Sequence, residues 1–72
     1  MEVRYDKEAD AMYIYAEKGA YEVSEEVGDG FIIDLSKDGK VIGIEILDVS
    51  EKFSPSVLKG IILRNGPNYG YI

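Results

Sequence analysis

Apolar and polar residues alternate along most of the first fifty positions, which is the period-two pattern of half-buried strands. The pattern is clearest in FIIDLSKDGKVIGIEIL, where two apolar runs flank Asp38-Gly39. This dipeptide favours a two-residue type I′ hairpin turn, which fixes how the flanking strands align. The alignment gathers apolar partners on one face of the sheet. It predicts the pairs Ser36–Val41, Leu35–Ile42, Ile33–Ile44 and Phe31–Ile46.

Two further turns extend this hairpin into a larger sheet. Lys18-Gly19 predicts that Ala16 pairs with Tyr21 and Ile14 with Val23. Gly28-Asp29-Gly30 is typical of a three-residue loop with Gly30 in the left-handed conformation. Glu25 then falls on the core face, and we expect it near an open end of the sheet. The predicted fold is α+β, a five-stranded antiparallel β-meander with a short C-terminal helix, and the strands cover 2–5, 11–16, 21–27, 30–36 and 41–49.

The pattern changes after residue 50, where FSPSVLKGIILRNG predicts a helix over 54–65. Ser54 is a suitable N-cap, and Pro55 suits the first helical position. The apolar residues of one side are Val57, Leu58, Ile61 and Ile62. A sixth strand over KGIILRN is the alternative. We expect a single domain over 1–72, with the β-meander in 1–50 and a loosely ordered tail at 66–72. The helix packs either on its own sheet or on another chain.

Size and charge limit what such a chain does. The chain has 72 residues and no cysteine or histidine, so neither a disulfide nor a usual zinc site supplements its small core. A core of this size is usually stabilised by association, which favours a homo-oligomer, most simply a dimer. The net charge of −6 repels phosphate backbones and attracts basic proteins. No secretory signal or membrane-length apolar run is present. We therefore expect a cytoplasmic protein that binds neither nucleic acid nor membrane.

The absence of histidine and cysteine also removes most nucleophile–base pairs. The spacing of Asp6, Glu8, Asp10 and Glu17 resembles a calcium loop, but Ala11 stands where such a loop needs glycine. We interpret this segment as a polar hairpin loop in which Asp6 or Asp10 binds nearby backbone amides. No metal or other cofactor is expected.

Two sets of side chains remain as candidates for function. Asp34 and Glu45 are diagonal neighbours on one face of the predicted hairpin, where two carboxylates could bind a divalent cation or work as an acid–base pair. Arg4, Tyr13 and Tyr15 share the outer face of the first hairpin. Tyrosine and arginine are enriched among interface hot spots, and the chain has 6 tyrosines, so these three residues indicate a partner surface.

Two stretches of the chain carry a further pattern, YDKEADAMYIYAEKG and VSEEVGDGFIIDLSKDGKVIGIEILDVSEKF. The residues of this pattern are Tyr5, Asp6, Ala9, Asp10, Tyr13, Ile14, Asp29, Gly30, Asp34, Asp38, Gly39, Gly43, Ile44, Glu45, Leu47, Asp48 and Ser50. In these residues and their order the chain resembles the small prokaryotic domains grouped as domain of unknown function family 2283. The resemblance covers about residues 1–53, with Val49 where the family often has alanine.

This resemblance implies no established activity, although some members of the family look like antitoxins encoded beside small toxin-like proteins. The motif acids become candidate functional residues: Asp6, Asp10, Asp34, Glu45 and Asp48. We expect a non-enzymatic protein–protein interaction module that binds a basic partner. The alternative is a carboxylate-based protein or enzyme that binds a divalent metal or a small ligand.

Overall fold

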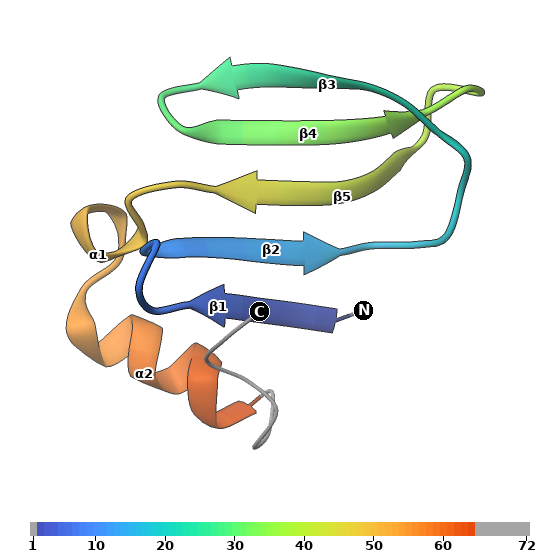
Figure 1. Cartoon of the computed structure of the whole chain (residues 1–72). Coiled ribbons are helices and arrows are strands. Elements are labelled where there is room, and N and C mark those ends of the chain that lie inside the picture. Colours follow the sequence, from blue (N-terminus) through green and yellow to red (C-terminus); the bar gives the residue numbers. More distant parts are fainter. Residues whose placement is uncertain (1, 65–72) are drawn as a thin grey trace.

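The computed structural model describes residues 2–64, with side chains up to residue 62, as one five-stranded sheet and two helices (Figure 1). The α+β class, the five antiparallel strands and the C-terminal helix are confirmed. The tail predicted at 66–72 lies outside the described residues. The elements are β1 (Glu2–Asp6), β2 (Ala11–Tyr15), β3 (Tyr21–Gly28), β4 (Phe31–Ser36), β5 (Val41–Ile46), α1 (Val49–Lys52) and α2 (Pro55–Arg64).

The strands lie side by side in the order β1-β2-β5-β4-β3. The predicted hairpin between the second and third strands is therefore wrong, because Ile14 pairs with Ile44 and not with Val23. Residues 16–20 instead run along the end of the sheet to its far edge (Figure 1). The apolar strand β5 takes the centre, whereas β3, with three glutamates, is exposed along its whole length. Charge on an edge strand stays in water and discourages pairing with other chains.

The β4–β5 hairpin keeps the predicted alignment away from its turn, including Ile33 opposite Ile44. At the turn the prediction is wrong. Gly39 has a φ of 82° but Asp38 does not share this left-handed conformation, so the turn is not type I′. The Gly39 amide donates to the Ser36 carbonyl at 2.9 Å, as in a type I turn that ends in a left-handed glycine. The extra loop residue shifts the register by one, and Leu35 pairs with Val41.

The β3–β4 hairpin is close to the prediction. Gly30 has a φ of 75°, which confirms its left-handed conformation. Gly28 pairs with Phe31, so the loop is one residue shorter than predicted. A register shift beside Glu26 compensates for this, and Val23 lies opposite Leu35 as the predicted loop requires. Glu25 lies opposite Ile33 on the exposed edge strand.

The chain leaves the sheet earlier than the predicted strand 41–49. Asp48 adopts a left-handed φ of 52°, and Val49, which is fully buried, begins α1. The Ser54 hydroxyl accepts the Val57 amide at 3.3 Å, as expected of the N-cap of α2. The predicted helix is confirmed, and the alternative sixth strand is wrong.

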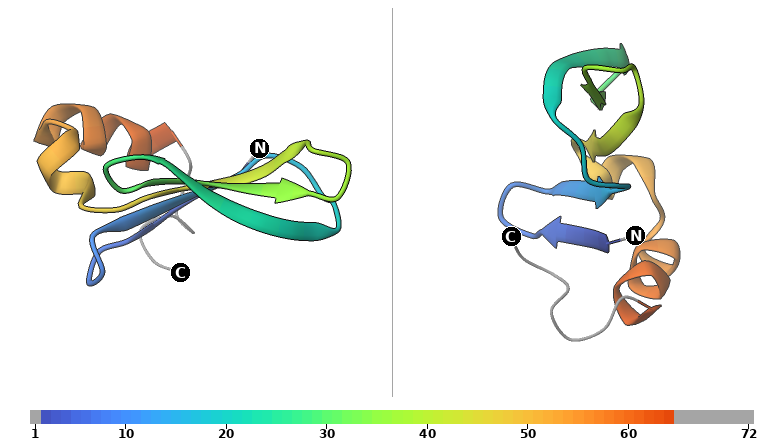
Figure 2. Two further views of the ribbon diagram at one scale, coloured as in Figure 1. Left: turned by 90° about the horizontal axis from the view of Figure 1, so that it is seen from above. Right: turned by 90° about the vertical axis from the view of Figure 1, so that its right-hand side faces the viewer.

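Both helices cover one side of the β1-β2-β5 part of their own sheet. The buried cluster comprises Tyr5, Met12, Ile46 and Val49, and the residues packed on it include Phe53, Leu58, Ile61 and Ile62. Val57 was predicted on this apolar side but is 50% exposed. Figure 2 shows both helices on the same side of the sheet. Within residues 2–64, neither helix has the length and the apolar run needed to cross a bilayer.

Candidate functional site

The side of the sheet opposite the helices, here called the open face, is organised by Tyr13. Residues alternate between the two sides of a strand, so the neighbours of the core residues Met12 and Ile14 project onto the open face. The Tyr13 hydroxyl donates to the Asp34 carboxylate at 2.9 Å. It reaches over Gly43, where a β-carbon would overlap the hydroxyl and lie 2.5 Å from Cζ of the ring. A glycine between two isoleucines of a central strand therefore lets this tyrosine cross β5.

Asp34 connects this tyrosine to the edge of the sheet. Its second carboxylate oxygen accepts the Ser24 hydroxyl at 2.6 Å, and Ser24 shares a hydrogen bond of 2.9 Å with the Tyr21 hydroxyl. The chain of hydroxyls and carboxylate joins β2, β4 and β3. Asp34 and Glu45 are diagonal neighbours, as predicted, because Asp34 lies opposite Gly43 and Ile32 opposite Glu45. The two acids differ in role, since both Asp34 oxygens already hold hydroxyl groups.

The environment of Tyr13 keeps its phenol protonated. Burial, the hydrogen bond to Asp34 and the charge of that carboxylate raise the pKa of Tyr13 to about 12. Tyr15 and Glu45 add smaller contributions in the same direction. At neutral pH the Tyr13 hydroxyl therefore acts as a hydrogen-bond donor and not as a base.

A groove of about 390 Å³ lies beside this network and is lined by Glu2, Arg4, Tyr13, Tyr15 and Glu45. We call it the tyrosine groove. The two tyrosine rings are 6.2 Å apart between centroids and almost perpendicular, at 89°. The structure thus brings the predicted partner residues Arg4, Tyr13 and Tyr15 together with one of the candidate acids.

The charges of the tyrosine groove are unevenly matched. Arg4 pairs with Glu2 of its own strand at 3.0 Å through an exposed ion pair. Glu45 lies directly opposite Tyr13 in the register. Among the residues that the structure describes, no hydrogen bond or ion pair engages its side chain. The groove therefore offers one carboxylate that no cation within the described residues engages.

Asp10 and Asp6, two other candidate acids, have structural contacts. The Asp10 carboxylate accepts the Ser50 hydroxyl at 2.6 Å, the Ser50 amide at 3.0 Å and the Tyr5 hydroxyl at 2.9 Å. These bonds lower the pKa of Asp10, and the bond from the Ser50 hydroxyl has the largest effect. Asp6 accepts the backbone amides of Glu8 and Ala9 within its own turn. The interpretation of this segment as a polar hairpin loop is confirmed.

The remaining acids do not assemble with these. Asp48 is exposed and precedes α1 as its N-cap residue, without a side-chain hydrogen bond to the helix. In the described part of the chain, no group of three or more carboxylates is placed to hold a metal ion. The five motif acids thus divide between the β1–β2 turn, the start of α1 and the open face.

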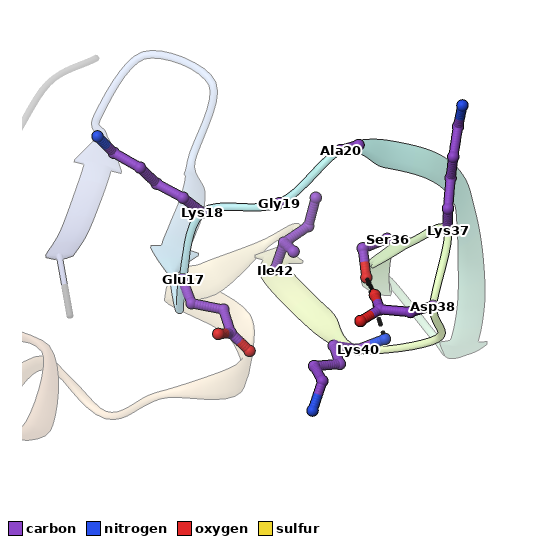
Figure 3. A pocket seen from close by; sticks show the side chains of 9 residues that line it. All are labelled: Glu17, Lys18, Gly19, Ala20, Ser36, Lys37, Asp38, Lys40 and Ile42. Atoms are coloured by element: carbon purple, nitrogen blue, oxygen red, sulfur yellow. Dashed lines mark hydrogen bonds between the residues drawn. The ribbon is translucent and has the colours of Figure 1, made fainter.

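A second hollow lies where residues 17–20 pass the β4–β5 turn (Figure 3). Its buried Ser36 donates to the Asp38 carboxylate and accepts the Lys40 amide at 3.2 Å. Figure 3 shows the side chains of Lys18, Lys37 and Lys40 pointing in different directions. The lysines do not converge on a common point, so this hollow is a feature of the turn and not a cradle for an anion.

Sequence reasoning missed the contacts of Gly43, Ser24 and Ser50. A glycine inside an otherwise apolar strand was the available signal for Gly43, because it indicates close approach by another group. Ser24 and Ser50 gave no such signal, since their partners lie 10 and 40 positions away in the chain.

Residues 2–50 match the model of the family described as "Protein of unknown function (DUF2283)". The chain belongs to this family. The match includes the sheet, the Tyr13–Asp34 network and the Asp10–Ser50 contact, and it ends before α2.

A curated protein of Methanosarcina mazei, named "Putative hypoxanthine phosphoribosyltransferase", is 38% identical to this chain over 50 residues. The aligned residues are 69% of this chain and 40% of that protein, so the chain spans well under half of its relative. No solved structure matches the chain.

Proposed function

We propose that this protein is a non-enzymatic binding module that presents its open face to a basic protein partner. The observation that carries the proposal is the tyrosine groove, which places Tyr13, Tyr15 and the unmatched Glu45 on the side of the sheet away from the helices. Tyrosines supply much of the binding energy in interfaces. A net charge of −6 speeds association with basic proteins by long-range attraction.

The chemistry of the open face favours binding over catalysis. Tyr13 stays protonated, and Asp34 is occupied by two hydroxyl donors. The same contacts weigh against a divalent-metal site between Asp34 and Glu45. The name of the Methanosarcina mazei relative describes phosphoribosyl transfer, but this chain aligns with only 40% of that longer protein. Phosphoribosyl transfer is therefore not part of the proposed function.

The family resemblance suggests the class of partner and its location. An antitoxin-like role requires a small basic toxin-like protein in the same cytoplasm, and the acidic groove suits such a partner. The proposal therefore predicts one basic protein that binds through the open face.

The test compares two variants that carry the same charge change. Tyr15→Ala with Glu45→Lys alters the tyrosine groove, whereas Glu8→Lys alters an exposed residue of the β1–β2 turn, at the other end of the first hairpin. A basic protein captured from the native cytoplasm is purified, and its affinity for each form is measured by calorimetry. We expect a loss of at least about tenfold for the groove variant, equivalent to about 1.4 kcal/mol, and little change for Glu8→Lys. Equal affinity for both variants would reject the open face as the binding surface.

We also propose that the chain forms a homodimer through the half of the sheet that the helices leave bare. Phe31 and Val23 of the β4–β3 hairpin remain 36% and 43% exposed, and a core this small benefits from burying them against a second copy. Sedimentation at micromolar concentration should give twice the chain mass of 8.0 kDa, and Val23→Glu should give the monomer. A wild-type monomer at that concentration would contradict the dimer.

A further inference from the structure

We infer that the tyrosine groove binds the guanidinium group of an arginine side chain supplied by the partner. This inference rests on the proposed function and names the chemical group that the groove recognises. A guanidinium is planar and cationic, it stacks on aromatic rings, and it donates paired hydrogen bonds to a carboxylate. The groove contains the two complementary groups, aromatic rings and a carboxylate.

The placement of the rings matches this ligand. Tyr13 is fixed by its hydrogen bond to Asp34, so that wall of the groove is rigid. Tyr15 stands almost perpendicular to it and is 44% exposed. One ring can therefore offer a face to a planar cation while the other borders its edge. Tyr13 is already held in place before a ligand binds, and this limits the entropy lost on binding.

The register places the carboxylate beside the rings. Glu45 lies directly opposite Tyr13, and Gly43, its neighbour on the same side of β5, lies opposite Tyr15. Side chains directly opposite in an antiparallel pair stand about 4.5–5.5 Å apart at Cβ. A cation that contacts the rings is therefore within reach of the Glu45 oxygens.

Arg4, the arginine that lines the tyrosine groove, is held away from this position. Arg4 is also opposite Tyr13, on the far side from Glu45, and would be the natural intramolecular partner of that acid. It pairs instead with Glu2, through both its Nε and a terminal nitrogen at 3.0 Å. Because Glu2 holds Arg4, the Glu45 carboxylate is left to bind a cation from another molecule.

The experiment titrates the full chain with Nα-acetyl-L-arginine methylamide and follows the Tyr15 ring and the Glu45 amide by NMR. The citrulline analogue has nearly the same shape without the charge and serves as the ligand control. We expect saturable shifts of both groups with the arginine compound, and no saturation with citrulline. Glu45→Gln should weaken binding by about three- to fivefold, as for one exposed ion pair, and Tyr15→Leu by a similar factor. Glu51→Gln, which removes an exposed acid of α1, should leave the affinity unchanged.

The outcomes separate this inference from the proposed function. Saturable binding of the arginine compound that Glu45→Gln weakens supports the guanidinium site, even when no protein partner uses the open face. Equal shifts with arginine and citrulline, or an affinity that Glu45→Gln leaves intact, overturn it, even when a protein partner does bind there. Shifts that depend on protein concentration alone would assign the groove to a second copy of the chain and would also overturn it.

Discussion

Replacing Gly43 by alanine tests the contact on which the open face depends. The added β-carbon would overlap the Tyr13 hydroxyl and lie 2.5 Å from Cζ and 3.1 Å from Cε1 of that ring. A separation below about 3.0 Å is not tolerated, so the ring must leave its position over β5. The Tyr13–Asp34 hydrogen bond then breaks, and one wall of the tyrosine groove moves.

The cost follows from two losses and one gain. A hydrogen bond to a charged acceptor contributes about 1.5 kcal/mol at the lower end of its range, which suits this partly buried site. Forcing a side chain from a packed position costs about 1–3 kcal/mol. Alanine gains about 0.5–1 kcal/mol over glycine because it loses less backbone entropy on folding. We therefore expect a net loss of about 2 kcal/mol, which lowers the melting temperature of a domain of this size by roughly 10 °C.

The assay is urea unfolding followed by circular dichroism, arranged as a double-mutant cycle with Tyr13→Ala. Without the ring the new methyl group meets no obstacle from Tyr13, so Gly43→Ala should be neutral or slightly stabilising in the Tyr13→Ala background. The coupling energy between the two sites should then be about 2–3 kcal/mol, because the gain from alanine remains in both backgrounds. An equal effect of Gly43→Ala in both backgrounds would refute the explanation and show that the glycine serves the strand itself.

Three further predictions concern the phenol of Tyr13, the carboxylate of Asp10 and Gly60 of α2. The phenol of Tyr13 should titrate near pH 12 when followed by ultraviolet absorbance. Asp34→Asn should lower this pKa, although burial keeps it above the pKa of a free tyrosine. An unchanged pKa in the variant would exclude Asp34 as a cause. Because the folded pKa is raised, this contribution to stability is complete below the unfolded pKa and is lost as pH rises through about 12. Asp10→Ala should lower the melting temperature at pH 7. Because the pKa of Asp10 is lowered in the folded protein, its contribution to stability is present above the unfolded pKa and is lost as pH falls through the folded pKa. The difference in melting temperature between Asp10→Ala and wild type should therefore shrink in acid. A difference that stays constant with pH would contradict the ionic contact. Gly60→Ala in α2, where a β-carbon would meet nothing within 4 Å, should stabilise the protein by about 1 kcal/mol, and a loss in urea unfolding would show a constraint on this glycine.

Local pattern determined the elements and part of their alignment. The pairing of Ile33 with Ile44 follows from the period-two alternation of two short runs joined by a glycine turn. The start of α2 follows from Ser54, which accepts an amide of the first turn, and from Pro55, whose fixed φ suits the first helical position. The diagonal placement of Asp34 and Glu45 follows from the same hairpin. Each depends on residues within one hairpin or one helical turn, so the sequence alone specifies it.

Only the tertiary structure decided which strands are neighbours and what their outer side chains touch. The alternation of β2 suits β3 as well as β5, and the choice depends on which strand the whole sheet can bury at its centre. Tyr13 reaches Asp34 across a strand that lies between them in space, over a separation of 21 residues in the chain. Such a contact depends on β5 lying between β2 and β4, because an order that separates these three strands removes Gly43 from beneath the ring. The open face and its groove are therefore properties of the assembled sheet, whereas its hairpins are properties of the sequence.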